Sequence, residues 1–120
     1  MRQEFKIFGI PMNLNEYRNA HFQVLNQQKK MWERLTIAES IAQKIQPVKR
    51  CQLTIHYFFK DRRKHDPDNY AASLKFILDG LVKAKILPDD NFDVIDSITI
   101  RQGGIDKKPY LIIQMDEIDA

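Results

Sequence analysis

The chain has 120 residues, of which 43% are hydrophobic and 29% charged, and this suits one globular domain with a modest core. No apolar run is long enough to span a membrane, and the lone Cys51 excludes an internal disulfide or a zinc site built from several cysteines. The net charge of +3 is too small by itself to indicate a nucleic-acid partner. Residues 1–4 do not open a signal peptide, so we expect a single cytoplasmic domain over residues 1–120, with no membrane partner.

The first third of the chain predicts a strand followed by a long helix. Residues 3–10 have a β-type composition and stop at Pro11, which indicates a strand. Residues 13–18 contain two asparagines and are expected to form a loop or short turn. Apolar residues then recur at helical spacing over 21–46, which predicts an amphipathic helix with an interruption near 26–28.

A second strand leads into the most basic segment of the chain. Residues 50–60 alternate between apolar and more polar positions, and this predicts a strand with one wetter face. The basic loop that follows, residues 60–65, carries four cations and one acid and so accounts for the whole net charge. A positive strip of this kind suits phosphate binding, although a simple solvated loop is the plainer interpretation.

A helix is expected to begin at Asp66, because an aspartate followed by Pro67 is a common helix start. At about 100° per residue, one face of this helix is apolar and would enter the core. That face is formed by Tyr70, Leu74, Ile77 and Leu81. The opposite face places Asp68 and Lys75 along one line, so that the lysine could lean back toward the acids.

The last quarter of the chain predicts two strands, at 93–102 and 109–116. Gly103-Gly104 is the turn signal between them, and we expect an antiparallel C-terminal hairpin. Helical crossovers join the earlier strands, so the predicted fold class is α/β (α+β). It is a single domain with a small mixed sheet of about four strands and helices packed on it.

Acidic residues gather at both ends of the predicted 66–83 helix. Asp66 and Asp68 lie at its start, and Asp89 and Asp90 follow its end. Carboxylates crowded together repel one another unless a cation lies between them, and Mg²⁺ is the usual hard cation with oxygen ligands. A calcium-binding loop is excluded because its required glycine and glutamate are missing from the segment after Asp66. Taken alone, Asp66 is as well explained as a helix cap and Asp68 as an acid of the first helical turn.

These residues together resemble the RusA-type crossover junction endodeoxyribonucleases, which resolve Holliday junctions. The resemblance covers most of the chain, from the early strand that ends in Pro11 to the Gly-Gly element near the C-terminus. The motifs that carry it are Asn13-Leu14-Asn15-Glu16-Tyr17, Asp66-x-Asp68-Asn69, Lys75-x-x-x-Asp79-Gly80-Leu81 and Asp89-Asp90. Pro67 stands where leucine is more usual, and Lys75 is matched through its spacing to Asp79.

The resemblance implies a catalytic site and its partners. Asp66, Asp68 and Asp90 would bind Mg²⁺, with Mn²⁺ as a substitute, and Lys75 would assist catalysis. Contacts to branched DNA would come from a larger set: Asn13, Asn15, Tyr17, Arg62, Arg63, Lys64, His65 and Asn69. The resemblance further implies a homodimer that makes paired cuts, and a bacterial source, phage and prophage genes included.

Two alternatives remain open at this point. The protein could be a non-catalytic module that binds branched DNA, with acids that only cap a helix and balance the basic loop. It could also be a metal nuclease that cuts another branched or flapped DNA. The second alternative uses the same residues, so the sequence does not separate it from a Holliday junction resolvase.

Overall fold

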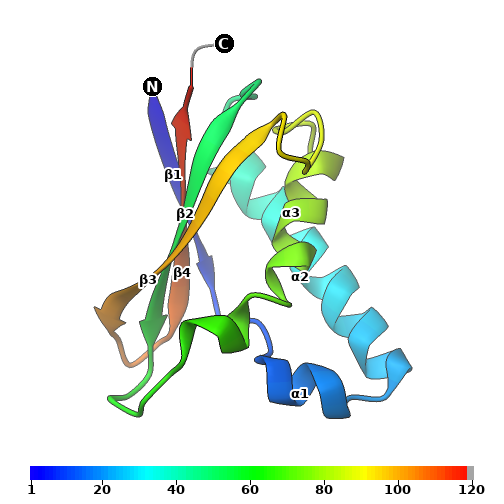
Figure 1. The fold of residues 1–120 in the computed structure, drawn as a ribbon, viewed down its shortest axis with the longest axis vertical. Coiled ribbons are helices and arrows are strands. Elements are labelled where there is room, and N and C mark those ends of the chain that lie inside the picture. The colour runs from blue at the N-terminus through cyan, green and yellow to red at the C-terminus, as the bar shows by residue number, and fades with distance from the viewer. Residues whose placement is uncertain (119–120) are drawn as a thin grey trace.

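A four-stranded mixed sheet forms one layer of the molecule, and the helices cover one of its faces (Figure 1). The computed structural model describes residues 1–118. The strands are β1 (Arg2–Phe8), β2 (Cys51–Phe59), β3 (Ile95–Ile105) and β4 (Tyr110–Glu117), in the spatial order β1-β4-β2-β3. The helices are α1 (Leu14–Asn19), α2 (Phe22–Ala42) and α3 (Leu74–Lys83), and a 3₁₀ turn, η1 (Pro67–Tyr70), precedes α3. The predicted α+β single domain is therefore confirmed.

Strand β2 is the centre of the sheet and of the core. It pairs in parallel with β3 and antiparallel with β4. Its alternate side chains point toward the helices and are buried: Cys51, Leu53, Ile55, Tyr57 and Phe59. The alternation predicted for residues 50–60 is confirmed. Because β2 ends at Phe59, its C-terminal end leads directly into the basic loop.

The C-terminal strands differ from the expected hairpin. β3 and β4 run antiparallel and are joined by only residues 106–109, but β2 lies between them and pairs with both. The glycines lie inside β3 rather than in the turn, because the ring of Phe58 passes over them. A Cβ atom on Gly103 would lie 2.5 Å from Phe58 Cζ. The chain instead turns around the end of β2, where the Asp106 N–H donates to the Phe59 carbonyl oxygen over 2.9 Å.

The segment predicted as a loop at 13–18 is mostly the short helix α1. Asn13 caps it: the Glu16 N–H donates to Asn13 Oδ1 over 3.0 Å, and the Asn13 N–H donates to Glu16 Oε1 over 3.4 Å. The long helix α2 runs without the interruption expected near 26–28. It stops before residue 46 because Lys44 has a left-handed backbone, with φ of 60°.

The helix expected from Asp66 is also divided. Residues 67–70 form η1, and α3 starts only at Leu74. Tyr70 explains the break, because its buried ring packs against Tyr57 and Phe59 and its hydroxyl is hydrogen-bonded to His65 Nδ1 over 3.0 Å. These contacts hold the turn against the sheet in a tighter geometry than an α-helix. The predicted apolar face is confirmed as core, but Asp68 and Lys75 do not share one helical line.

Within residues 1–118, none of the helices has both the length and the apolar composition that crossing a membrane requires.

Candidate functional site

The basic loop is the exposed connection from β2 to η1. Asp61 binds Arg63 twice, through the guanidinium at 3.2 Å and through the backbone N–H at 3.0 Å. Arg62 and Lys64 are exposed and form no salt bridge within residues 1–118. These two cations have no carboxylate partner among the described residues, and their contact with DNA stays a prediction.

His65 closes the loop by packing against the core. Its ring stacks face to face on Phe59, with 3.8 Å between centroids and 6° between planes. Its Nδ1 is hydrogen-bonded to the Tyr70 hydroxyl, and its side chain is only 23% exposed. The structure gives His65, predicted as a DNA contact, a clear packing role.

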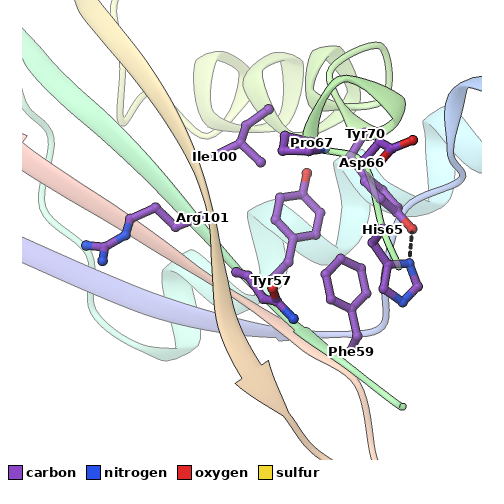
Figure 2. A pocket seen from close by; sticks show the side chains of 9 residues that line it. Tyr57, Phe59, His65, Asp66, Pro67, Tyr70, Ile100 and Arg101 are labelled. Atoms are coloured by element: carbon purple, nitrogen blue, oxygen red, sulfur yellow. Dashed lines mark hydrogen bonds between the residues drawn. The ribbon is translucent and has the colours of Figure 1, made fainter. Parts of the chain in front are cut away.

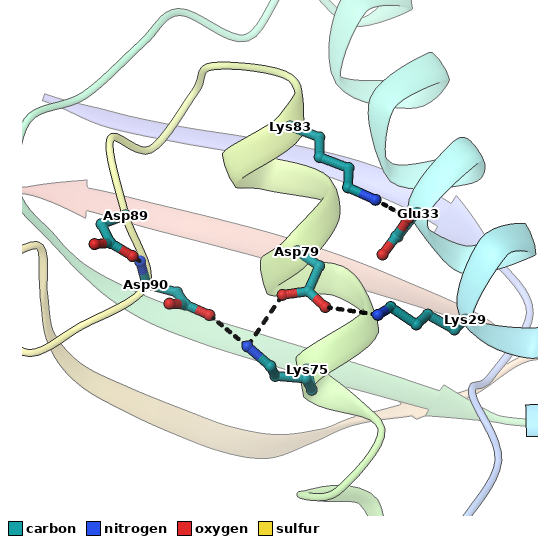
Figure 3. Close-up of polar contacts among 7 residues, drawn as sticks. All are labelled: Lys29, Glu33, Lys75, Asp79, Lys83, Asp89 and Asp90. Atoms are coloured by element: carbon teal, nitrogen blue, oxygen red, sulfur yellow. Dashed lines mark hydrogen bonds and ion pairs between the residues drawn. The ribbon is translucent and has the colours of Figure 1, made fainter. Parts of the chain in front are cut away.

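Two of the predicted catalytic residues, Lys75 and Asp90, form a direct hydrogen-bonded ion pair (Figure 3). Lys75 Nζ lies 2.9 Å from Asp90 Oδ2 and 3.1 Å from Asp79 Oδ1, and Asp79 is reached in turn by Lys29 at 4.0 Å. The hydrogen bond from Lys75 lowers the pKa of Asp90, and hydrogen bonds to Asp90 and Asp79 raise the pKa of Lys75. Asp90 is thus held ionised by a lysine.

The three predicted metal ligands do not converge in this structure. No group of three or more aspartate, glutamate, histidine or cysteine side chains within residues 1–118 is arranged to hold one ion. The donor chemistry of three carboxylates suits Mg²⁺, but the arrangement does not, because Asp90 turns to Lys75 and Asp66 and Asp68 lie on the separate η1 segment. Lys75 supplies here the positive charge that a cation was expected to supply.

Three separate hollows follow one another beside β3, and each is bordered by one of the predicted catalytic residues. The first is bordered by Asp90, and it shares Ile98 with the second, which is bordered by Lys75. The second shares Ile100 with the third, which is bordered by Asp66. We call this series the β3 trough. It places Asp66 near one end, Asp90 near the other and Lys75 between them.

The remaining predicted DNA contacts surround the same end of the molecule or have structural roles. Asn13 caps α1, and Tyr17 stacks on Phe76 with centroids 6.1 Å apart. Asn15 is exposed on α1, the helix that packs beside η1 (Figure 1). Asn69 lies within η1 and donates its backbone N–H to the Asp66 carbonyl oxygen over 3.0 Å.

Two features of the site were absent from the sequence-based prediction. One is Lys29 on α2, which extends the Lys75–Asp79 contact across to a second helix. The other is an aromatic cavity beside Asp66, lined by Tyr57 and Tyr70. The alternation of β2 already indicated that Tyr57 points inward, and a tyrosine hydroxyl in a core requires a partner, so a signal for this cavity did exist.

Compared with known proteins, the sequence matches no family model and shows no significant match to a curated protein.

Proposed function

We propose that the protein is an endodeoxyribonuclease that cuts branched DNA, with the Holliday junction as its substrate and Mg²⁺ as its cofactor. The observation that carries the proposal is the β3 trough. Its hollows border Asp66 at one end and the Lys75–Asp90 pair toward the other, and the exposed basic loop leads directly into Asp66. Acids and a lysine beside free cations are the groups that phosphodiester hydrolysis uses.

The basic loop would position the DNA without recognising its sequence. Arg62 and Lys64 are exposed, and each can bind a phosphate oxygen from either strand. Such contacts release counterions, so the affinity for DNA should fall steeply with salt concentration. The loop ends at Asp66, so a DNA backbone held by the loop would pass the mouth of the β3 trough.

Lys75 and the acids would act on the scissile phosphate. Hydrolysis needs a group that accepts the proton of the attacking water and a cation that stabilises the charge growing on the phosphate oxygens. Lys75 is 63% exposed on its side chain and could serve as that cation once it is released from Asp90. Joint binding of an ion by Asp66, Asp68 and Asp90 would require Asp90 to leave Lys75 and the 66–73 segment to move toward it.

Resolving a four-way junction requires two symmetric cuts, so the proposal includes a homodimer with one site in each subunit. Light scattering of the purified protein should give twice the mass of one 14.2 kDa chain. A monomer at micromolar concentration, alone and with a junction, would contradict this part of the proposal.

The test of the nuclease compares Asp66→Asn and Asp90→Asn, which replace acids that border the β3 trough, with Asp93→Asn. Asp93 is an exposed acid of the same loop as Asp90, but it borders none of the hollows of the β3 trough. Strand cutting is measured with a labelled four-way junction in Mg²⁺ or Mn²⁺. The first two variants should lose about 100-fold or more of the cutting rate, while Asp93→Asn retains it. Binding should persist in all three because the basic loop is intact, and equal cutting by all three would exclude these acids from catalysis.

The Lys75–Asp90 contact favours a second candidate, a non-catalytic module that binds branched DNA. In this contact the charge of the Asp90 carboxylate is already balanced by Lys75, so no metal ion is needed. In that case junctions would be bound with a steep salt dependence and left uncut in either metal. Flapped and three-way substrates belong in the same assay. Preferential cutting of one of these substrates would support the nuclease activity and replace the Holliday junction as its proposed substrate.

A further inference from the structure

A small cavity opens beside Asp66 at the end of the β3 trough (Figure 2). Its volume is about 80 Å³. Residues from β2, from the end of the basic loop, from η1 and from β3 line it, chiefly Tyr57, Phe59, His65, Pro67, Tyr70 and Ile100. The walls are therefore mostly planar rings and apolar side chains, which suit a flat ligand.

Two buried polar atoms of residues that line this cavity have no hydrogen-bond partner within residues 1–118, the Tyr57 hydroxyl and His65 Nε2. The Tyr57 hydroxyl is the more deeply placed of the two, on the central strand β2. Tyr57 is only 1% exposed. The neighbouring Tyr70 hydroxyl, by contrast, is bonded to His65. Burial raises the pKa of Tyr57 well above its usual range, so the hydroxyl keeps its proton and can donate as well as accept a hydrogen bond. A buried polar group of this kind points to a missing partner.

The lining excludes several kinds of ligand. An anion such as phosphate is disfavoured, because Asp66 lies at the rim and the Arg101 side chain extends away from the cavity (Figure 2). A metal ion is disfavoured, because Asp66 is the only carboxylate among the lining residues. The volume exceeds that of one water molecule and is smaller than a cavity that encloses benzene, so it fits the edge of a ring inserted from the open side.

We propose that this cavity receives the edge of one unpaired nucleobase at the branch point of the DNA, with the Tyr57 hydroxyl as its hydrogen-bond partner. The proposal deepens the proposed function and rests on it for the identity of the substrate. Phosphates held by the neighbouring Arg62 and Lys64 would bring an adjacent base to the cavity mouth. Unstacking a base at a branch point costs less free energy than unstacking one inside a duplex arm. A hydrogen bond to its edge would make the choice of cutting site depend on sequence.

The test uses Tyr57→Phe, which removes only the hydroxyl, with Tyr110→Phe as its control. Tyr110 alternates with buried residues of β4 and lies on the sheet face opposite the helices. Junction binding is measured with an intact branch point and with single abasic sites placed on each branch-point nucleotide in turn. For wild type, one abasic position should weaken binding about fivefold, the size expected for one hydrogen bond. Tyr57→Phe should bind the intact junction about fivefold more weakly and show no further loss at that abasic position. Tyr110→Phe should behave as wild type.

Two further measurements decide the interpretation. Tyr57→Phe should unfold at the same temperature as wild type or higher, because the lost hydroxyl has no partner in the chain; a fall of several degrees would show a structural role and overturn the proposal. Where wild type cuts junctions, its preference among branch-point sequences should flatten in Tyr57→Phe. Equal cutting preferences and equal abasic responses in the two proteins would show a cavity that holds only water. A further outcome is that wild type cuts no junction and yet binds one abasic junction more weakly, with no such loss in Tyr57→Phe. That result would contradict the proposed nuclease activity and support the proposed base-binding cavity.

Discussion

Gly80 on α3 lies at a close contact with the neighbouring helix α2. A Cβ atom there would lie 2.7 Å from Thr36 Cβ and 3.0 Å from Thr36 Cγ2, both on the neighbouring helix α2. Thr36 is fully buried, and its hydroxyl donates to the Trp32 carbonyl oxygen over 2.7 Å, so it cannot move aside freely. The glycine therefore serves packing, although it also belongs to the motif that resembles the resolvases.

We predict that Gly80→Ala destabilises the protein. Alanine favours a helix by about 1 kcal/mol over glycine, but the overpacking should cost about 1–3 kcal/mol and outweigh this gain. Urea denaturation should show a lower free energy of unfolding with an unchanged m-value. A rise in stability would show that α2 and α3 can separate without cost.

Cys51 should be unreactive toward thiol reagents in the folded protein. It is fully buried at the start of β2, and burial raises the pKa of its thiol from 9.0 to about 11. A thiol-specific reagent at pH 8 should therefore react only after urea unfolds the chain. Because the unfolded state loses this proton first, the contribution of the thiol to stability should be constant below about pH 9 and decline between about pH 9 and 11. Rapid labelling without denaturant would contradict the burial.

Individual residues were predictable where local pattern determines their environment. The alternation in β2 correctly placed Cys51 in the core, and helical spacing correctly placed Leu74, Ile77 and Leu81 there. His65 was predicted from its basic neighbours to contact DNA, but its position depends on Phe59 and Tyr70, which lie on two other elements. Sequence spacing alone does not reveal a stacking partner of this kind.

Helices α2 and α3 are also joined by a partly buried ion pair (Figure 3). Lys83 Nζ lies 2.6 Å from Glu33 Oε2, and the Glu33 side chain is only 8% exposed. Glu33 Oε1 has no hydrogen-bond partner within the described chain. The carboxylate therefore depends on Lys83 for compensation of its charge.

We predict that Lys83→Met costs about 1–3 kcal/mol of stability, because it leaves the Glu33 carboxylate buried and unpaired. The double variant Lys83→Met with Glu33→Met should recover most of this loss, since no charge then remains in the interface. Thermal and urea unfolding of the four proteins of this cycle provide the measurement. Additive losses from the two changes would show that the pair contributes nothing as a unit.

The type of most elements could be predicted, but their pairing could not. All four strands and α2 occur close to the predicted ranges, whereas α3 starts only at Leu74. The Gly-Gly pair suggested a hairpin because the sequence does not show that the ring of Phe58 lies over β3. That ring leaves no space for a side chain on Gly103. The division of the 66–83 helix likewise depends on contacts of Tyr70 with β2. Both departures arise from residues distant in sequence.

In the whole molecule, the sheet determines which chemical groups meet. Because β2 and β3 are parallel neighbours, the connection between them returns over the helix-covered face of the sheet, and it carries the basic loop, η1, α3 and the Asp89–Asp90 turn. This explains why acids at both ends of the connection border the same β3 trough. The sequence predicted that the acids would lie along one structural unit, but not that Lys75 would bind Asp90 in place of a shared ion.

The most direct test of the proposed nuclease is the fate of a four-way junction labelled on all four strands and incubated with the wild-type protein and Mg²⁺. The account predicts cuts on two opposed strands at symmetric positions, giving nicked duplexes that a DNA ligase can seal, and no cuts without divalent cation. Arg62→Ala with Lys64→Ala should slow this cutting through weaker binding, with a smaller dependence of affinity on salt. A junction that is bound but intact on all four strands, in Mg²⁺ and in Mn²⁺, would contradict the account.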